Sequence, residues 1–190
     1  MPAKSRNATE VADLVLQLGR AAYANCSAGG LTQAQWIAMR YFSRANRFSR
    51  TVSGFAEFHA TTRGTASQTI KSLVAKGYLS RRASDRDGRS VRFDLTSLAT
   101  RKLGSDPLED VVRAVETLTA AQQQGTAAGL RAALGELEKS RAANEKIGIC
   151  RLCGYLETRS ANTGNRCRLM REALETSELE ELCIRHEAKT

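Results

Sequence analysis

The sequence lacks the features of a membrane-spanning or exported chain. No apolar run among its 190 residues approaches the ~20 that a spanning helix needs. Residues 1–8 carry no apolar stretch of the kind found in a signal peptide. Internal repeats and low-complexity tracts are also missing. We therefore expect a cytoplasmic protein with room for one substantial domain, or for one domain and an appendage.

Side chains suited to acid–base catalysis are scarce as well. The chain has two histidines, His59 and His186. His59 follows Phe58 near the end of an expected helix, where a structural role is favoured. The sequence also has no pattern of alternating strands and helices that would predict a parallel sheet. These absences favour a protein that is not an enzyme.

Positive charge is abundant and confined to one region. The formal net charge is +9. Between Arg40 and Arg92, twelve Lys and Arg stand against three acids, Glu57, Asp85 and Asp87, so this segment carries the whole excess. Concentrated charge of this kind favours a polyanionic partner. The alternative is a solvated basic face that binds nothing.

Residues 52–79 have the pattern of a helix-turn-helix. Helices are expected at 52–58 and at about 63–76, with Thr62 as N-cap of the second and Gly77 at its C-terminal end. Six apolar side chains are expected to form one small core: Phe55, Phe58, Ile70, Leu73, Val74 and Leu79. A different set, polar and at helical spacing, suits a DNA surface better than a core: Thr62, Arg63, Thr65, Ser67, Gln68 and Lys71.

A β-hairpin is expected to follow the second helix. Val91, Phe93 and Leu95 alternate with polar residues, which indicates a half-buried strand. Asp87-Gly88 is a turn signal, so the basic run 81–89 would form the tip of a two-stranded wing. The predicted fold is therefore mainly α with a small β-hairpin wing, a winged helix-turn-helix with a helical dimerisation region. Arg82 is expected to contact DNA phosphates.

Further helices are expected on both sides of this motif. Thr32 and Gln35 form a capping box at the start of one helix, and Thr96 can cap the helix after the wing. Residues 104–107 should then kink or split the helical segment, and Gly125-Thr126 should break it again. Apolar stripes within 11–18 and 108–118 exceed what a single winged domain needs to bury. They predict a homodimer.

Residues 31–103 resemble the MarR family of bacterial transcription regulators. The resemblance rests on five motifs: the helix start at 31–32, the helix entry 62–67, the helix exit 73–79, the wing 85–89 and the strand into the next helix at 91–96. It implies a homodimer with intertwined first and last helices. It also implies one recognition helix per half-site in the major groove and wing arginines in the minor groove, here Arg86 and Arg89.

Four of the five cysteines fall within 34 residues near the C-terminal end. Cys150-x2-Cys153 is followed after thirteen residues by Cys167 and after fifteen more by Cys183-x2-His186. A C-x2-C pair lets two thiolates hold one metal, and three or four thiolates suit zinc or an iron–sulfur cluster. The predicted ligands are the four cysteines, with His186 as an alternative ligand. The choice between zinc and iron–sulfur stays open.

The expected organisation is a set of four consecutive regions: 1–30 a dimerisation helix, 31–100 the DNA-binding domain, 101–146 C-terminal dimerisation helices and 147–190 a cysteine-rich metal-binding tail. A short helix is expected at 172–185, and Cys26 is expected to be buried. The predicted function is that of a dimeric DNA-binding regulator, a repressor. Its cysteine cluster would sense redox or metal state by shifting the tail against the dimer helices, with a small-molecule or redox effector as a further partner.

Three alternatives remain beside this function. The first is a thiol oxidoreductase that uses Cys150 and Cys153, although such chemistry normally lies at a strand-to-helix junction. The second is a constitutive DNA-binding protein with a structural zinc site. The third is a tail of free cysteines in an ordinary C-terminal segment.

Overall fold

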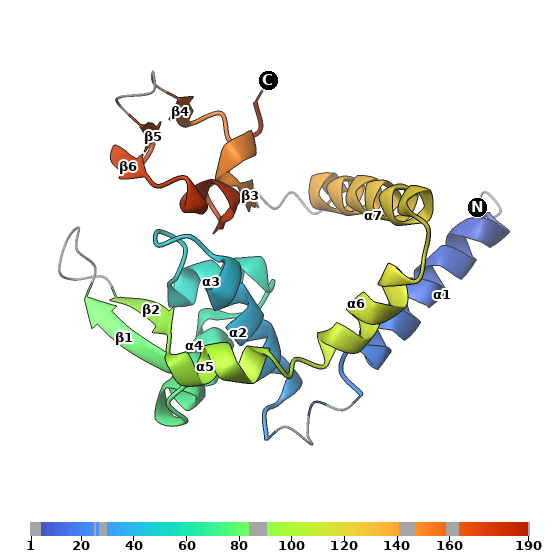
Figure 1. Ribbon diagram of the computed structural model, residues 1–190, viewed down its shortest axis with the longest axis horizontal. Coiled ribbons are helices and arrows are strands. Elements are labelled where there is room, and N and C mark those ends of the chain that lie inside the picture. The colour runs from blue at the N-terminus through green and yellow to red at the C-terminus, as the bar shows by residue number, and fades with distance from the viewer. Residues whose placement is uncertain are drawn as a thin grey trace.

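The computed structural model of the chain describes residues 5–24, 26, 30–83, 91–140, 147–158 and 164–189. Its elements form three consecutive groups (Figure 1). The first group is α1 (Arg6–Ala21), α2 (Gln33–Arg44), α3 (Val52–Phe58), α4 (Arg63–Ala75), β1 (Leu79–Ala83) and β2 (Val91–Leu95). The second is α5 (Ser97–Leu103), α6 (Leu108–Glu116) and α7 (Ala120–Ser140). The third contains β3 (Gly148–Ile149), η2 (Cys150–Leu152), β4 (Leu156–Thr158), β5 (Asn165–Cys167), β6 (Glu172–Leu174), η3 (Ser177–Glu180) and β7 (Leu182–Cys183).

Within the first group, α2, α3, α4, β1 and β2 form a winged helix-turn-helix, and the predicted fold class is confirmed. Its core is built around α2, which buries Trp36, Met39 and Phe42. Phe55 from α3 and Phe93 from β2 lie with their ring centroids 6.1 Å from that of Phe42. Helix α4 adds Ile70 and Leu73 to the same core. Burial of these large side chains removes apolar surface from water, which stabilises the domain.

Local capping signals fix where these helices begin. Thr32 accepts a hydrogen bond from the backbone N–H of Gln35, whose side chain accepts one from the N–H of Thr32, so the predicted capping box is present. Thr62 and Thr96 cap α4 and α5 in the predicted positions. Gly77 ends α4 with φ of +76°, a conformation that L side chains rarely adopt. Each boundary depends on residues within four positions of one another.

The wing is an antiparallel pair in which Leu79 lies opposite Leu95 and Ala83 opposite Val91. Of the predicted core residues, Phe55, Ile70, Leu73 and Leu79 are buried and Phe58 packs partly against them. The prediction for Val74 is wrong, because its side chain is 36% exposed. Successive residues on a helix turn by about 100°, so burying Leu73 carries Val74 towards solvent.

The helices after the wing break where predicted at 104–107 but not at Gly125. Arg40 of α2 pairs with Asp106 in the first break, with Nε 2.6 Å from Oδ2. Helix α7 runs without interruption through Gly125, and the second break lies before it, at 117–119. A helical glycine costs only ~1 kcal/mol relative to alanine, which a helix of 21 residues tolerates.

Helices α1 and α6 carry no buried residue. Their apolar side chains are exposed in the monomer: Val11, Leu14, Val15, Leu16, Leu18, Val112 and Val115. In Figure 1 these helices and α7 lie on the side of the winged helix away from the wing. None of the described helices combines the length and apolar character that crossing a bilayer requires.

The tail from residue 147 consists of very short strands. Strands β3 and β7 pair antiparallel, and β4, β5 and β6 form a second small sheet. The predicted helix at 172–185 is therefore wrong, since this segment forms β6, η3 and β7. Leu182 and Ile184 enter the main core of the winged helix. The tail thus packs on the winged helix, whereas the sequence analysis placed it against the dimer helices.

Candidate nucleic-acid interface and cysteine pocket

The exposed face of α4 carries the predicted DNA-contacting side chains. Arg63, Gln68 and Lys71 are exposed and Ser67 is half-buried. Thr62 and Thr65 are exposed, but Thr62 Oγ1 accepts from the Thr65 N–H at 3.1 Å and lies 2.9 Å from Thr65 Oγ1. These two hydroxyls therefore stabilise the helix start, and the long polar side chains remain available for a ligand.

Arg82 is the predicted DNA-contacting residue that lies in the described part of the wing. Its side chain is 65% exposed, and Nε lies 3.3 Å from Asp94 of β2. An exposed pair of this kind is weak, so Arg82 can exchange Asp94 for another anion. The predicted minor-groove residues Arg86 and Arg89 lie outside the described residues.

Residues 45–50, which we call the α2–α3 connection, link the tail to the winged helix. Arg50 pairs with Asp94 on the wing at 3.1 Å and with Glu181 in the tail at 3.4 Å. The Phe93 N–H also donates to the Arg50 carbonyl at 2.8 Å. One arginine side chain therefore contacts both the wing strand β2 and the tail.

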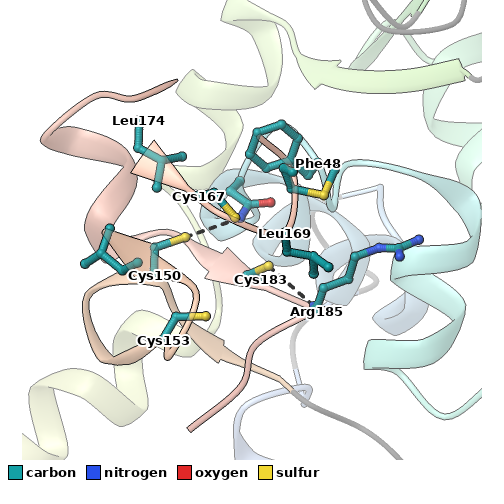
Figure 2. A pocket seen from close by; sticks show the side chains of 11 residues that line it. Phe48, Cys150, Cys153, Cys167, Leu169, Leu174, Cys183 and Arg185 are labelled. Atoms are coloured by element: carbon teal, nitrogen blue, oxygen red, sulfur yellow. Dashed lines mark hydrogen bonds between the residues drawn. The ribbon is translucent and has the colours of Figure 1, made fainter. Parts of the chain in front are cut away.

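All four cysteines of the tail line a single pocket (Figure 2). Cys150 begins η2, Cys153 directly follows it, Cys167 ends β5 and Cys183 ends β7. The rest of the wall is largely apolar: Phe48, Leu156, Leu169, Met170, Leu174, with Asn46 and Arg185. The pocket brings together four cysteines that are spread over 34 residues of the sequence, and their predicted role as metal ligands stays a prediction.

Hydrogen bonds reach two of these sulfurs. Asn46 Nδ2 donates to Cys150 Sγ at 3.5 Å, and the Arg185 N–H donates to Cys183 Sγ at 3.4 Å. The hydrogen bond between the two thiols raises the pKa of Cys150 and lowers the pKa of Cys183 to about 6. N–H donors to sulfur favour the thiolate form, which is the form that binds metals.

The four thiols are donors that suit a thiophilic metal or cluster. They do not converge on a single point. Within the described residues, no three Cys, His, Asp or Glu side chains converge closely enough to hold a single ion. His186, the alternative ligand, is not among the side chains that line the pocket. Its ring lies against Gly148, where a Cβ would come within 2.6 Å of the ring, and its Nε2 is buried with no hydrogen-bond partner in the described residues.

The α2–α3 connection contains functional residues that the sequence analysis missed. Asn46 donates from its N–H to the Leu182 carbonyl at 2.8 Å, and Ser49 Oγ accepts from the Ile184 N–H at 3.2 Å. Arg47 pairs with Glu178 at 2.8 Å. Gly54 lets α3 approach this connection, because a Cβ would lie 2.3 Å from the Ser49 carbonyl. No local sequence pattern marks these contacts, since their partners lie more than 100 residues away.

Comparison with known proteins supports the winged-helix assignment. Residues 29–90 match the MarR family. This match covers α2, α3, α4 and β1 and ends just before β2, and it agrees with the resemblance found in the sequence. Helices α5, α6 and α7 and the tail lie beyond the match. No curated protein sequence matches the chain.

Several solved structures share the MarR-type fold. The Staphylococcus aureus MepR–DNA complex is 16% identical and has a TM-score of 0.57, covering 70% of this chain and 99% of that one. A MarR/EmrR family regulator from Acinetobacter sp. ADP1 is 18% identical with a TM-score of 0.56, covering 70% and 96%. A MarR protein from Peptoclostridium difficile is 13% identical with a TM-score of 0.55, covering 73% and 92%. At these identities the likeness establishes the fold.

Proposed function

We propose that the chain is a dimeric DNA-binding transcription regulator, a repressor, whose cysteine pocket binds a metal or an iron–sulfur cluster. The observation that carries this proposal is the coincidence of a basic excess with the exposed polar face of α4 on a MarR-type winged helix. One of the structural neighbours is a MepR–DNA complex. Side chains near the start of such a helix reach base edges, while flanking cations hold phosphates.

A second copy of the chain is the proposed partner of α1 and α6. Their exposed apolar side chains form faces that the described monomer leaves uncovered. Contiguous apolar surface of this kind marks protein–protein contacts. Sedimentation at micromolar concentration should give a dimer. A monomer under these conditions would contradict the proposal.

The cysteine pocket is the proposed site of sensing. It adjoins the α2–α3 connection, which leads directly into α3 and contacts the wing through Arg50. A ligand that binds one arrangement of the tail better than another would bias this connection. The alternative of a dithiol oxidoreductase has less support, because Cys150 and Cys153 are only 6% and 5% exposed and a reactive thiol needs access.

DNA binding measured against salt concentration tests the interface. The full chain is titrated with a duplex obtained by selection from a random library and with an unselected duplex. Gln68→Ala should weaken the selected duplex by ~1–3 kcal/mol and the unselected duplex far less, because a Gln pairs with adenine through two hydrogen bonds. Lys71→Ala should weaken both equally and reduce the salt slope by about one, as the loss of one phosphate contact does.

Arg131→Ala is the matched control, since it removes one exposed positive charge from α7, outside the proposed interface. It should leave both the affinity and the salt slope close to those of the unmodified chain. Equal effects of Gln68→Ala on both duplexes would show that α4 does not read bases. No effect of either interface variant would overturn the proposed function.

A further inference from the structure

The pocket contacts one polar side chain from the winged helix, Asn46. It is fully buried and belongs to the α2–α3 connection, 104 residues away from Cys150 in the chain. Its Nδ2 donates to Cys150 Sγ at 3.5 Å, and its Oδ1 accepts from the Ser49 N–H at 3.0 Å. The backbone of Asn46 also binds Leu182 next to Cys183. Hydrogen bonds at its backbone and at its side-chain oxygen therefore fix Asn46, while its side-chain Nδ2 points at the Cys150 sulfur.

The donors that line the pocket fit an iron–sulfur cluster. All four tail cysteines line it (Figure 2), and His186, the nitrogen ligand considered from the sequence, does not. Iron–sulfur clusters place several irons between four cysteine sulfurs. Apolar walls and N–H donors to sulfur are the surroundings that tune such clusters.

We propose that the pocket holds an iron–sulfur cluster on Cys150, Cys153, Cys167 and Cys183, and that Asn46 donates a hydrogen bond to the cluster-bound Cys150 sulfur. Asn46 is thus a positioning residue that links the cluster to the DNA-binding domain. This inference rests on the proposed cysteine site. It names the cofactor class and a winged-helix side chain that donates a hydrogen bond to the ligand Cys150.

The reduction potential of the cluster distinguishes the proposed role of Asn46 from a merely structural one, because a structural role alone would not change this potential. Reduction adds one electron to the cluster, here from dithionite, and makes it more negative. A hydrogen bond to a ligating sulfur stabilises that more negative state. Removal of the donor should therefore shift the midpoint potential to a more negative value.

The test uses the full chain, reconstituted without oxygen from ferric iron, sulfide and a thiol reductant, which together supply the oxidation states of the cluster. The unmodified protein should bind iron and acid-labile sulfide and absorb in the visible. Asn46→Ala should retain a cluster with a more negative midpoint potential and a several-fold faster loss of absorbance in air. If Asn46→Ala does not fold, Asn46→Ser replaces it, because a serine can keep the turn to Ser49 while its side chain is too short to reach Cys150.

Gln35→Ala is the matched control. Gln35 is also a buried side-chain amide of the winged helix, but its Nε2 donates to Ser72 and its Oε1 accepts from the Thr32 N–H. The midpoint potential of this variant should equal that of the unmodified chain. The same shift in Gln35→Ala, or no shift in the Asn46 variants, would overturn the role of Asn46. Uptake of one zinc with no iron or sulfide would overturn the cluster and leave the proposed metal-binding regulator intact, whereas loss of DNA binding alone would overturn the regulator and leave the cluster intact.

Discussion

The winged helix and the cysteine tail reach their structures by different routes. In the winged helix, caps such as Thr32 and Thr62 fix each helix locally, and large side chains around Trp36 and Phe42 then bury one core. The tail has strands of two or three residues and a small cluster of its own around Leu174 and Leu179. Isolated short strands are marginal in water. The tail therefore depends on its docking to the winged helix and on the proposed thiol ligation.

Removal of the four thiols should cause the largest difference in protease resistance between the winged helix and the tail. Changing Cys150, Cys153, Cys167 and Cys183 together to Ser should abolish metal binding and loosen the tail, because metal ligation in small domains contributes ~10 kcal/mol to folding. Trypsin should then cut the tail while α2–α4 stay protected. Cys26→Ala is the control, since Cys26 lies in the winged-helix core, and it should retain full metal content. Full metal content in the quadruple variant would contradict the ligand assignment.

The next largest effect is expected in the winged-helix part, at Arg40. Arg40 and Asp106 are 16% and 11% exposed, so the loss of one partner leaves a buried charge uncompensated. Arg40→Ala should lower the free energy of unfolding by ~3–5 kcal/mol, measured by chemical denaturation. Arg113→Ala removes an exposed pair with Asp110 and should cost less than ~1 kcal/mol. Equal costs for the two variants would contradict the buried role of Arg40.

Ser49→Ala should have a smaller effect, which is expected to be confined to the docking of the tail and to leave the folding of the winged helix unchanged. Ser49→Ala leaves the buried Ile184 N–H without its acceptor, which costs ~1–3 kcal/mol. Hydrogen exchange should accelerate in the tail and stay unchanged in α4. Uniform acceleration across both regions would mean that they unfold as one unit and that the contrast drawn above is wrong.

The smallest effect is expected for Arg82→Ala. The side chain is mostly exposed, and Asp94 keeps its contact with Arg50. The free energy of unfolding should therefore change by less than ~1 kcal/mol. Affinity for DNA should fall evenly across sequences, with the salt slope reduced by about one. A large loss of stability with no change in the salt slope would make Arg82 a structural residue.

Sequence reasoning succeeded where structure is local and failed where it is not. The N-caps Thr32, Thr62 and Thr96 have their partners three residues away, so their helix starts could be predicted. The helix expected at 172–185 is displaced by pairing of β7 with β3 and of β6 with β5. Such pairing depends on distant segments. Propensity within one segment does not reveal it.

The same distinction applies to the candidate sites. Clustering of cysteines in the sequence predicted shared metal ligation, which stays a prediction, and the structure places all four tail cysteines around one pocket. Asn46 and Ser49 carried no signal, since polar residues between helices are common. Their importance comes from burial against residues 182–184. Val74 was misplaced for a different reason: the apolar stripe of α4 is narrow, and one step along the helix decides between core and solvent.

An occupied cysteine pocket should alter DNA binding through the α2–α3 connection. This is tested by the affinity of the full chain for one selected duplex, with the reconstituted cofactor and after its removal by a chelator, at the same salt concentration. Coupling between two sites typically changes affinity ~5–150-fold, and we expect a change within this range that Asn46→Ala diminishes. Equal affinity with and without the cofactor would instead mean that the chain is a constitutive DNA-binding protein with a structural metal site.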